Sequence, residues 1–241
     1  MSLLLEDIKT YLASLPLTTA LRLAGARLAL RLLDSRAAVS YSQFGEDRVL
    51  PLFIKSEQPG FYVDVGANDP IATSNTFWLY KKGWRGIVID PNPELIRRHK
   101  RMRPRDVQVA NLVSNCRDPL EFTIFKNHPF SSASAARVRE LRSKLRAIAT
   151  ITLRPRTLTE ILDEQCCPET FDLLAIDVEG HDLQVLQSLD WKRYRPRMVV
   201  VEMPIFNLLS PQANEINNLM FTQGYCLCAF DGYNGYFRSS E

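Results

Sequence analysis

The sequence predicts an α/β fold with a mostly parallel, doubly wound sheet. From residue 61 onward, short runs rich in β-branched residues alternate with segments that carry helical signals. Acidic residues stand at or near the ends of four of the predicted strands. Because crossovers between parallel strands are short and right-handed, this alternation favours a single sheet covered by helices on both faces.

The N-terminal 38 residues differ from the rest in being rich in Leu, Ala and Arg. One helical stripe contains Leu17, Leu21, Ala24, Leu28 and Leu32. Leu23, Leu30 and Leu33 fall on the opposite side, whereas a membrane-surface helix has one clean polar face. We therefore expect residues 1–38 to form a helical extension that packs on the main domain, 39–241, or on a second copy in a homo-oligomer. Membrane contact through this extension is the alternative.

Two helices and three strands are predicted between residues 61 and 109. The strands are 61–65, 86–89 and 107–109, and the helices are 73–82 and 93–102. Gly83 ends the first helix, and Pro93 suits the first turn of the second. A strand with one solvent-exposed face follows at 120–125.

The second half of the chain continues the alternation. Helices are predicted at 137–146, 158–165, 182–189 and 214–221, and strands at 171–176, 198–201, 225–230 and 236–238. A short turn signal at 231–235 joins the last two strands, so one of them must run antiparallel.

Composition and charge exclude several classes of protein. Of 241 residues, 46% are hydrophobic and 24% are charged, which is typical of a globular chain. The net charge of +3 does not by itself indicate a nucleic-acid partner. The five cysteines are odd in number and show no repeated spacing, so we expect reduced thiols in a cytoplasmic protein, peripheral at the inner membrane face if the extension touches lipid. No apolar run approaches the roughly 20 residues of a membrane-spanning helix.

Four acidic residues follow predicted strands: Asp64, Asp90, Asp177 and Glu202. In doubly wound sheets ligands bind beyond the carboxyl ends of the strands, so these residues predict one polar pocket rather than four separate turns. Asp90 lies 26 residues after Asp64, where such folds place the carboxylate that binds a ribose diol.

The turn after the first strand contains Gly66 but lacks the further glycines that cradle a pyrophosphate. Asn68, Asp69 and Pro70 stand in their place. A nicotinamide oxidoreductase is therefore disfavoured. A nucleoside without a pyrophosphate, such as S-adenosylmethionine, fits better.

The segment 177–182 carries the strongest catalytic signal. In an extended chain Asp177, Glu179 and His181 share one face, because alternate residues point the same way. They would then form a general base with its orienting partner, or hold a divalent cation together with Glu202. The remaining interpretation is an acidic helix start.

The segment 97–105 concentrates basic residues: Arg97, Arg98, Lys100, Arg101, Arg103 and Arg105. We interpret it as a solvated helix face and predict no nucleic-acid partner. His99 and His128 have no neighbouring candidate catalytic residues in the sequence, so we expect both at the surface.

Several short segments resemble the FkbM family of S-adenosylmethionine-dependent methyltransferases. They are 42–47 (SQFGED), 62–68 (YVDVGAN), 74–76 (SNT), 83–86 (GWRG), 90–94 (DPNPE), 176–181 (IDVEGH), 189–191 (LDW) and 230–234 (FDGYN). The resemblance implies a class I, Rossmann-like methyltransferase fold with a seven-stranded sheet and an antiparallel strand near the C-terminus. Asp90 stands where many relatives have Glu, and residues 1–40 match no part of the pattern.

The resemblance also implies roles for individual residues. Asp64, Gly66 and Asn68 would line the methionine end of the cofactor, Asp90 would take the ribose, and Asn111 and Leu112 would flank the adenine. The whole predicted cofactor set is Gln43, Glu46, Asp64, Gly66, Ala67, Asn68, Ser74, Asp90, Pro91, Asn111 and Leu112.

The predicted function is methyl transfer to a hydroxyl of a small-molecule or carbohydrate acceptor. His181, Glu179 and Asp177 are the predicted catalytic residues, and the loop 129–134 with the helix after it is expected to shape the acceptor pocket. A non-catalytic nucleoside-binding or scaffold module is the alternative. A nucleic-acid methyltransferase is disfavoured, because Asp177-Val-Glu179 stands where such enzymes carry a Pro-rich amide or Cys motif.

Overall fold

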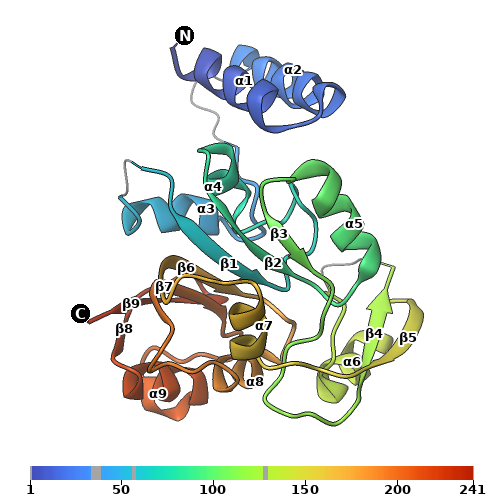
Figure 1. The fold of residues 1–241 in the computed structure, drawn as a ribbon, viewed down its shortest axis with the longest axis vertical. Helices are drawn as coiled ribbons and strands as arrows, with labels where there is room; N and C mark the ends of the chain where they lie inside the picture. The colour runs from blue at the N-terminus through green and yellow to red at the C-terminus, as the bar shows by residue number, and fades with distance from the viewer. Residues whose placement is uncertain (1, 34–38, 56–57, 127–129, 241) are drawn as a thin grey trace.

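The main sheet has seven strands and confirms the predicted α/β class. In the computed structural model, which describes residues 2–33, 39–55, 58–126 and 130–240, the strand order is β3-β2-β1-β6-β7-β9-β8 (Figure 1). Their bounds are β1 (Phe61–Val65), β2 (Arg85–Ile89), β3 (Val107–Val109), β6 (Thr170–Ile176), β7 (Arg195–Glu202), β8 (Tyr225–Phe230) and β9 (Asn234–Ser239). Strand β9 runs antiparallel to both neighbours, and the other pairings are parallel, as in a class I methyltransferase fold.

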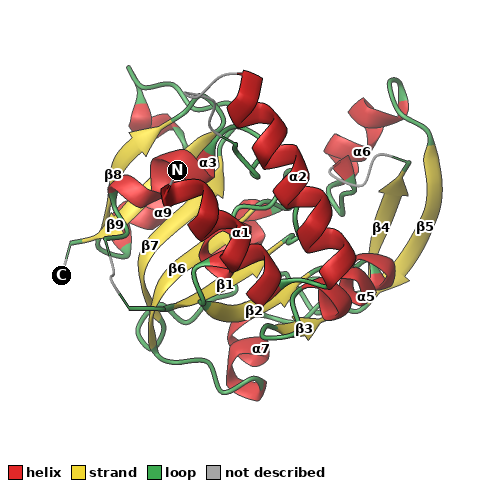
Figure 2. Ribbon diagram, turned by 90° about the horizontal axis from the view of Figure 1, so that it is seen from above, coloured by secondary structure: helices red, strands yellow, loops and turns green. Residues whose placement is uncertain are grey.

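The central strands are buried on both faces because helices cover both sides of the sheet (Figure 2). Val63 and Leu174 point to one core, whereas Tyr62 and Leu173 point to the other. This alternation follows from the two-residue period of a strand. The covering helices and short 3-10 turns are α3 (Glu46–Val49), η1 (Leu50–Leu52), α4 (Phe77–Lys81), α5 (Pro93–Met102), α7 (Leu158–Glu164), α8 (Asp182–Gln187), η3 (Pro211–Ala213) and α9 (Glu215–Thr222).

Helix α4 is shorter than the predicted helix 73–82. Thr73 has a positive φ of 57°, a conformation that no helix interior accepts, so the segment 73–76 forms a loop. The Ser74 hydroxyl accepts a hydrogen bond from the Phe77 amide (3.2 Å) and closes the start of the helix. This loop becomes part of the site described below.

A two-stranded antiparallel sheet is inserted after β3. Strand β4 (Leu120–Phe125) pairs with β5 (Ala147–Leu153), and α6 (Ala135–Arg142) lies between them in the chain. The sequence prediction missed β5 and extended the preceding helix to residue 146. Most side chains of β5 are exposed, so its hydrophobic pattern lacks the buried face that marks an ordinary strand. The insertion stands beside the main sheet in both ribbon views (Figures 1 and 2).

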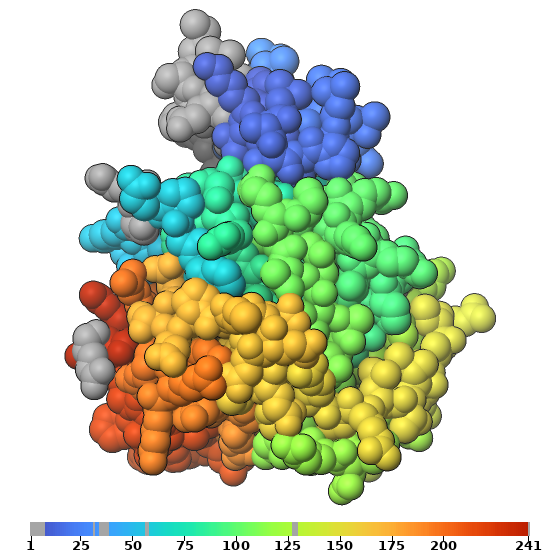
Figure 3. All heavy atoms as spheres, in the orientation of Figure 1, coloured from blue at the N-terminus to red at the C-terminus, as the bar shows by residue number. Residues whose placement is uncertain are grey.

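The N-terminal helices α1 (Ser2–Ser14) and α2 (Leu17–Leu33) form a pair at one end of the molecule (Figure 3). Tyr11, Leu15 and Ala20 are buried against Phe77 and Tyr80 of α4. Of the stripe predicted from periodicity, Ala24 packs against this cluster, but its four leucines stay exposed: Leu17, Leu21, Leu28 and Leu32. Within the described residues, no helix is long and apolar enough to cross a membrane. Residues 34–38, where the extension was predicted to end, lie outside the described residues.

Shortening a side chain in the contact with α4 is expected to destabilise the protein. Leu15 is 8% exposed, and Leu15→Ala should lower the free energy of unfolding by about 2 kcal/mol. In a chain of this size that corresponds to about 4–8 °C in melting temperature. Leu21→Ala is the matched control, because Leu21 is 57% exposed and should leave the melting temperature unchanged.

Thermal denaturation of both variants, and of the chain lacking residues 1–38, checks the role of this contact. Packing on the domain requires that the truncated chain melt at a lower temperature. A truncated chain that is equally stable and only loses liposome binding would instead support the membrane alternative.

Candidate functional site

A cavity of about 760 Å³, counting the space at its mouth, opens where β1, β2 and β6 end. Most of the predicted residues lie in its walls: Gln43, Asp64, Gly66, Ala67, Asn68, Asp90, Pro91, Asn111, Leu112, Asp177 and His181. The prediction missed the other wall residues, which are Val65, Thr73, Asn75, Ile89, Leu95, Val113, Phe122 and Val178, whereas Ser131 and Ala133 belong to the loop 129–134 that was expected to shape the acceptor pocket. Glu46, Ser74, Glu179 and Glu202 lie outside the walls.

Gly66 lets the ends of two neighbouring strands approach closely. It has a φ of +81°, and a Cβ atom there would lie 1.8 Å from the carbonyl oxygen of Asp177. The Asp177 amide donates to the Val65 carbonyl at 3.0 Å, and the Gly66 amide donates to the Ile89 carbonyl at 2.9 Å. Only a glycine permits this approach, so Gly66 shapes the floor of the cavity.

Asp90 presents a buried carboxylate to the cavity at the end of β2. Its oxygens accept hydrogen bonds from the Asn68 amide (3.1 Å) and the Asn92 amide (2.8 Å). Burial raises the pKa of Asp90 to about 6, so the group is mostly ionised at neutral pH. A carboxylate has about four acceptor positions, and those that the amides leave free can accept the two hydroxyls of a ribose.

Three amide oxygens in the walls have no hydrogen-bond partner among the described residues. They are the Oδ1 atoms of Asn68, Asn75 and Asn111, and all three are buried. Buried acceptors without partners are rare in folded proteins, so these atoms indicate a ligand with several donors. S-adenosylmethionine carries such donors in its two amino groups and its ribose hydroxyls, and the residues present therefore fit this cofactor. Asn75 belongs to the segment 74–76 (SNT) that carries the family resemblance, but only Ser74 of that segment was predicted to contact the cofactor.

His181 lies in the wall just before α8, and its partner differs from the prediction. The Nε2 atom is 3.0 Å from the Ser114 hydroxyl, whereas Glu179 or Asp177 was expected to orient the ring. Burial lowers the pKa of His181, so the ring is neutral at pH 7 and can accept a proton.

Glu179 does not share a face with His181, and that prediction is wrong. Glu179 has a φ of 54° and Gly180 a φ of 87°, so the chain turns there instead of extending. The Glu179 carboxylate accepts hydrogen bonds from Arg137 Nε (3.0 Å) and Nη2 (2.8 Å), and its carbonyl accepts one from the Ser132 hydroxyl (2.7 Å). Glu179 therefore ties the insertion to the end of β6.

Asp177 carries a half-buried carboxyl in the cavity wall. Burial, followed by the nearby carboxylate of Glu202, raises the pKa of Asp177 well above its usual range. Burial and the carboxylate of Asp182 raise the pKa of Glu202 to about 8. Among the residues that the structure describes, no three His, Cys, Asp or Glu side chains are grouped to hold a metal ion. The predicted set of Asp177, Glu179, His181 and Glu202 therefore does not fit a cation, and we derive no step through one.

Two predicted cofactor residues support the cavity from outside. Glu46 is buried, and it accepts hydrogen bonds from Asn234 Nδ2 (2.9 Å) and from the Phe44 amide (2.9 Å). Glu46 thereby fixes the segment that carries Gln43 against β9. Ser74 bonds to α4 and to Arg103, and it does not line the cavity.

The basic segment 97–105, which forms the end of α5 and the turn after it, is only partly a solvated face. Arg97, Lys100 and Arg101 are exposed as expected, but Arg103 and His99 are fully buried. The His99 Nε2 atom lies 3.0 Å from the carbonyl oxygen of Asn68, a residue of the cavity wall. The prediction that His99 and Arg103 lie at the surface is therefore wrong. His128 lies outside the described residues.

The comparisons with known proteins identify the family. A search of curated proteins found no match. A crystal structure of a TehB-like SAM-dependent methyltransferase from Corynebacterium glutamicum is 13% identical, covering 90% of this chain and 97% of that one, but its TM-score of 0.42 is too low to support an inference. The sequence model of the methyltransferase FkbM domain matches residues 64–227, well over half of the chain and including Asp64, Asp90 and His181. The chain therefore belongs to the FkbM family of S-adenosylmethionine-dependent methyltransferases.

Proposed function

We propose that this methyltransferase acts on a hydroxyl group of a small-molecule or carbohydrate acceptor. The observation that carries the proposal is the neutral imidazole of His181 in the wall of the cavity that also contains Asp90. A hydroxyl is a poor nucleophile at neutral pH and needs a group that takes its proton. A neutral imidazole is suited to that task.

The cofactor supplies an electrophilic methyl group when it is bound. Asp90 would bind the ribose, Asn111 and Leu112 the adenine, and Asp64 with Asn75 the amino-acid end. The unpartnered Oδ1 atoms of Asn111 and Asn75 support these assignments, because both cofactor ends carry amino donors.

His181 takes the acceptor proton in this proposal. Its Nε2 atom is engaged with the Ser114 hydroxyl, so we assign the accepting role to Nδ1. Holding the acceptor oxygen against the reacting carbon can contribute a further 7–11 kcal/mol, roughly. That part of the rate would come from the cavity walls rather than from the base.

The insertion is the part of the chain best placed to select the acceptor. Phe122, Ser131 and Ala133 line the cavity beside His181, and the Arg137–Glu179 ion pair holds the insertion against β6. Surface insertions on a rigid scaffold commonly carry specificity. Of the predicted acceptor loop 129–134, residue 129 lies outside the described residues.

Transfer of an isotopically labelled methyl group to a panel of free, nucleotide-linked and lipid-linked sugars tests the proposal. We expect a product in which one hydroxyl carries the label, detected by mass spectrometry, and much less product with Asp90→Ala when the cofactor concentration is below saturation. Binding of cofactor without transfer to any acceptor would support the non-catalytic alternative. Labelled DNA or RNA, or a label on nitrogen, would overturn the assignment to hydroxyls.

A further inference from the structure

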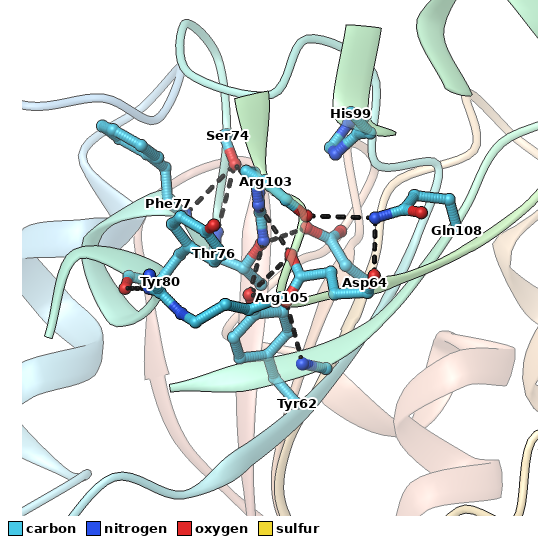
Figure 4. A network of polar contacts seen from close by, with 12 residues as sticks. Tyr62, Asp64, Ser74, Thr76, Phe77, Tyr80, His99, Arg103, Arg105 and Gln108 are labelled. Carbon is cyan, nitrogen blue, oxygen red and sulfur yellow. Dashed lines mark hydrogen bonds and ion pairs between the residues drawn. The ribbon is translucent and has the colours of Figure 1, made fainter. Parts of the chain in front are cut away.

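Arg103 is a fully buried cation that the proposed mechanism does not use (Figure 4). Its Nε donates to Asp106 Oδ2 at 2.8 Å, and its Nη1 donates to the Ser74 hydroxyl at 3.2 Å. Its Nη2 donates to the Tyr62 hydroxyl (2.7 Å) and to the Thr76 hydroxyl (2.9 Å). The guanidinium therefore joins β1, the loop 73–76 and the segment that leads into β3.

A chain of two hydrogen bonds leads from Arg103 through Thr76 to Asp64, and in each bond the donor is the residue nearer to Arg103. A guanidinium can only donate, so Thr76 Oγ1 accepts from Arg103 and must direct its own proton elsewhere. That proton goes to Asp64 Oδ2 at 2.5 Å. Asp64 lines the cavity, whereas Arg103 and Thr76 do not.

We propose that Arg103 is a positioning residue for the cofactor, which acts through Thr76 to hold the Asp64 carboxylate in the cavity wall. The proposal rests on the proposed cofactor site, because Asp64 would bind the amino-acid end. Ser74 and Thr76 flank Asn75, so the same guanidinium also fixes the loop that presents the unpartnered Asn75 oxygen.

The charges around Asp64 support this role. Burial raises the pKa of Asp64 to about 6, the Arg103 charge and the Thr76 hydrogen bond lower it, and the Asp106 carboxylate raises it. Asp90 is a further negative charge within range of Asp64. Without the guanidinium, Asp64 would stand among two carboxylates in a buried site and would take up a proton near neutral pH.

Stability alone does not explain a buried arginine. The desolvation of a buried ion pair often cancels its attraction, and apolar replacements of such pairs can be as stable as the original. The hydrogen bonds of Arg103 instead converge on a wall of the cavity. This makes a role in binding the better explanation of its retention.

Thr76→Val keeps the shape of the side chain and removes the hydroxyl that links Arg103 to Asp64. We expect the Kd for S-adenosylhomocysteine, measured by calorimetry at pH 7.5, to rise about tenfold or more, because a hydrogen bond to a charged group is lost. The pH below which binding weakens should move upward, and Thr76→Ser should restore both values. Tyr225→Phe is the control, because it removes a buried hydroxyl that bonds to the Pro196 carbonyl, away from the cavity.

Asp64→Asn tests the same proposal in case Thr76→Val does not fold. It keeps the shape of Asp64 and removes its charge, and it should weaken binding to a similar extent. A folded Thr76→Val or Asp64→Asn variant with wild-type affinity and an unchanged pH profile would overturn the proposal. A wild-type protein that does not bind the cofactor would overturn the proposed function as well, so the two failures are distinguishable.

Discussion

Asp90→Ala is expected to weaken S-adenosylmethionine binding by about 3 kcal/mol, or roughly 100-fold in Kd, because hydrogen bonds from two hydroxyls to a carboxylate are lost. The buried amides of Asn68 and Asn92 also lose their acceptor, which loosens the turn around the ribose. Isothermal titration calorimetry measures the change. Asp90→Asn is the milder control, since it keeps one acceptor oxygen. Unchanged affinity in the alanine variant would remove Asp90 from the cofactor site.

The pH dependence gives an independent check, because lowering the pH should weaken cofactor binding and stabilise the fold. The pKa of Asp90 is about 6, so its carboxylate becomes protonated as the pH falls from 7 to 5, and cofactor affinity should fall with it. Because this pKa lies above the unfolded value, the ionised form costs folding stability at neutral pH. As the pH falls from 7 to 5, the contribution of Asp90 to the free energy of unfolding should therefore rise. Comparison with Asp90→Asn isolates both effects.

His181→Ala is expected to lower kcat by a factor of about 10²–10⁴, the usual contribution of a general base, and to leave the cofactor Kd nearly unchanged. Wild-type turnover should decline at acidic pH, below the lowered pKa of His181, where the ring becomes charged. High pH should partly rescue the alanine variant, because hydroxide replaces the missing base. Steady-state rates across a pH series, measured with an acceptor from the panel above, supply these values.

Ser114→Ala tests how much the hydrogen bond to Ser114 contributes to the activity of His181 as a base. It removes the hydroxyl 3.0 Å from Nε2 and should lower the rate less than His181→Ala does. A chelator should leave the wild-type rate intact. Turnover of His181→Ala within about threefold of wild type would contradict the assignment. Loss of activity with chelator, and its recovery with added cation, would favour the metal alternative over the base.

Much of the fold was predictable because its signals are local. The bounds of β1, β3, β4, β8 and α5 coincide with the predicted ranges. Each of these strands is a short run of strand-forming residues. Helix α5 starts at Pro93, whose fixed φ suits a first turn. The acidic residues after the strands are equally local, and parallel topology places them at one edge of the sheet.

Where local signals compete with packing, the prediction failed. Strand β5 lacks a buried face, and α4 begins late because Thr73 and Ser74 form a loop around Arg103. Glu179 was placed on an extended face, but its left-handed conformation turns it towards Arg137, 42 residues earlier. A hydrophobic or charge pattern does not show whether packing selects an extended or a left-handed backbone at Glu179, or a helix or a loop at residues 73–76.

The sequence by itself determined the sheet, the turn at Gly66 and the positions of Asp90 and His181 near the ends of strands. Only the tertiary structure decided the partners: Ser114 for His181, Arg137 for Glu179, and Arg103 for Thr76. These pairs are 67, 42 and 27 residues apart in the chain. Secondary structure follows from periodicity and backbone preference over a few residues, whereas a buried hydrogen bond depends on which distant groups the folded core brings within reach.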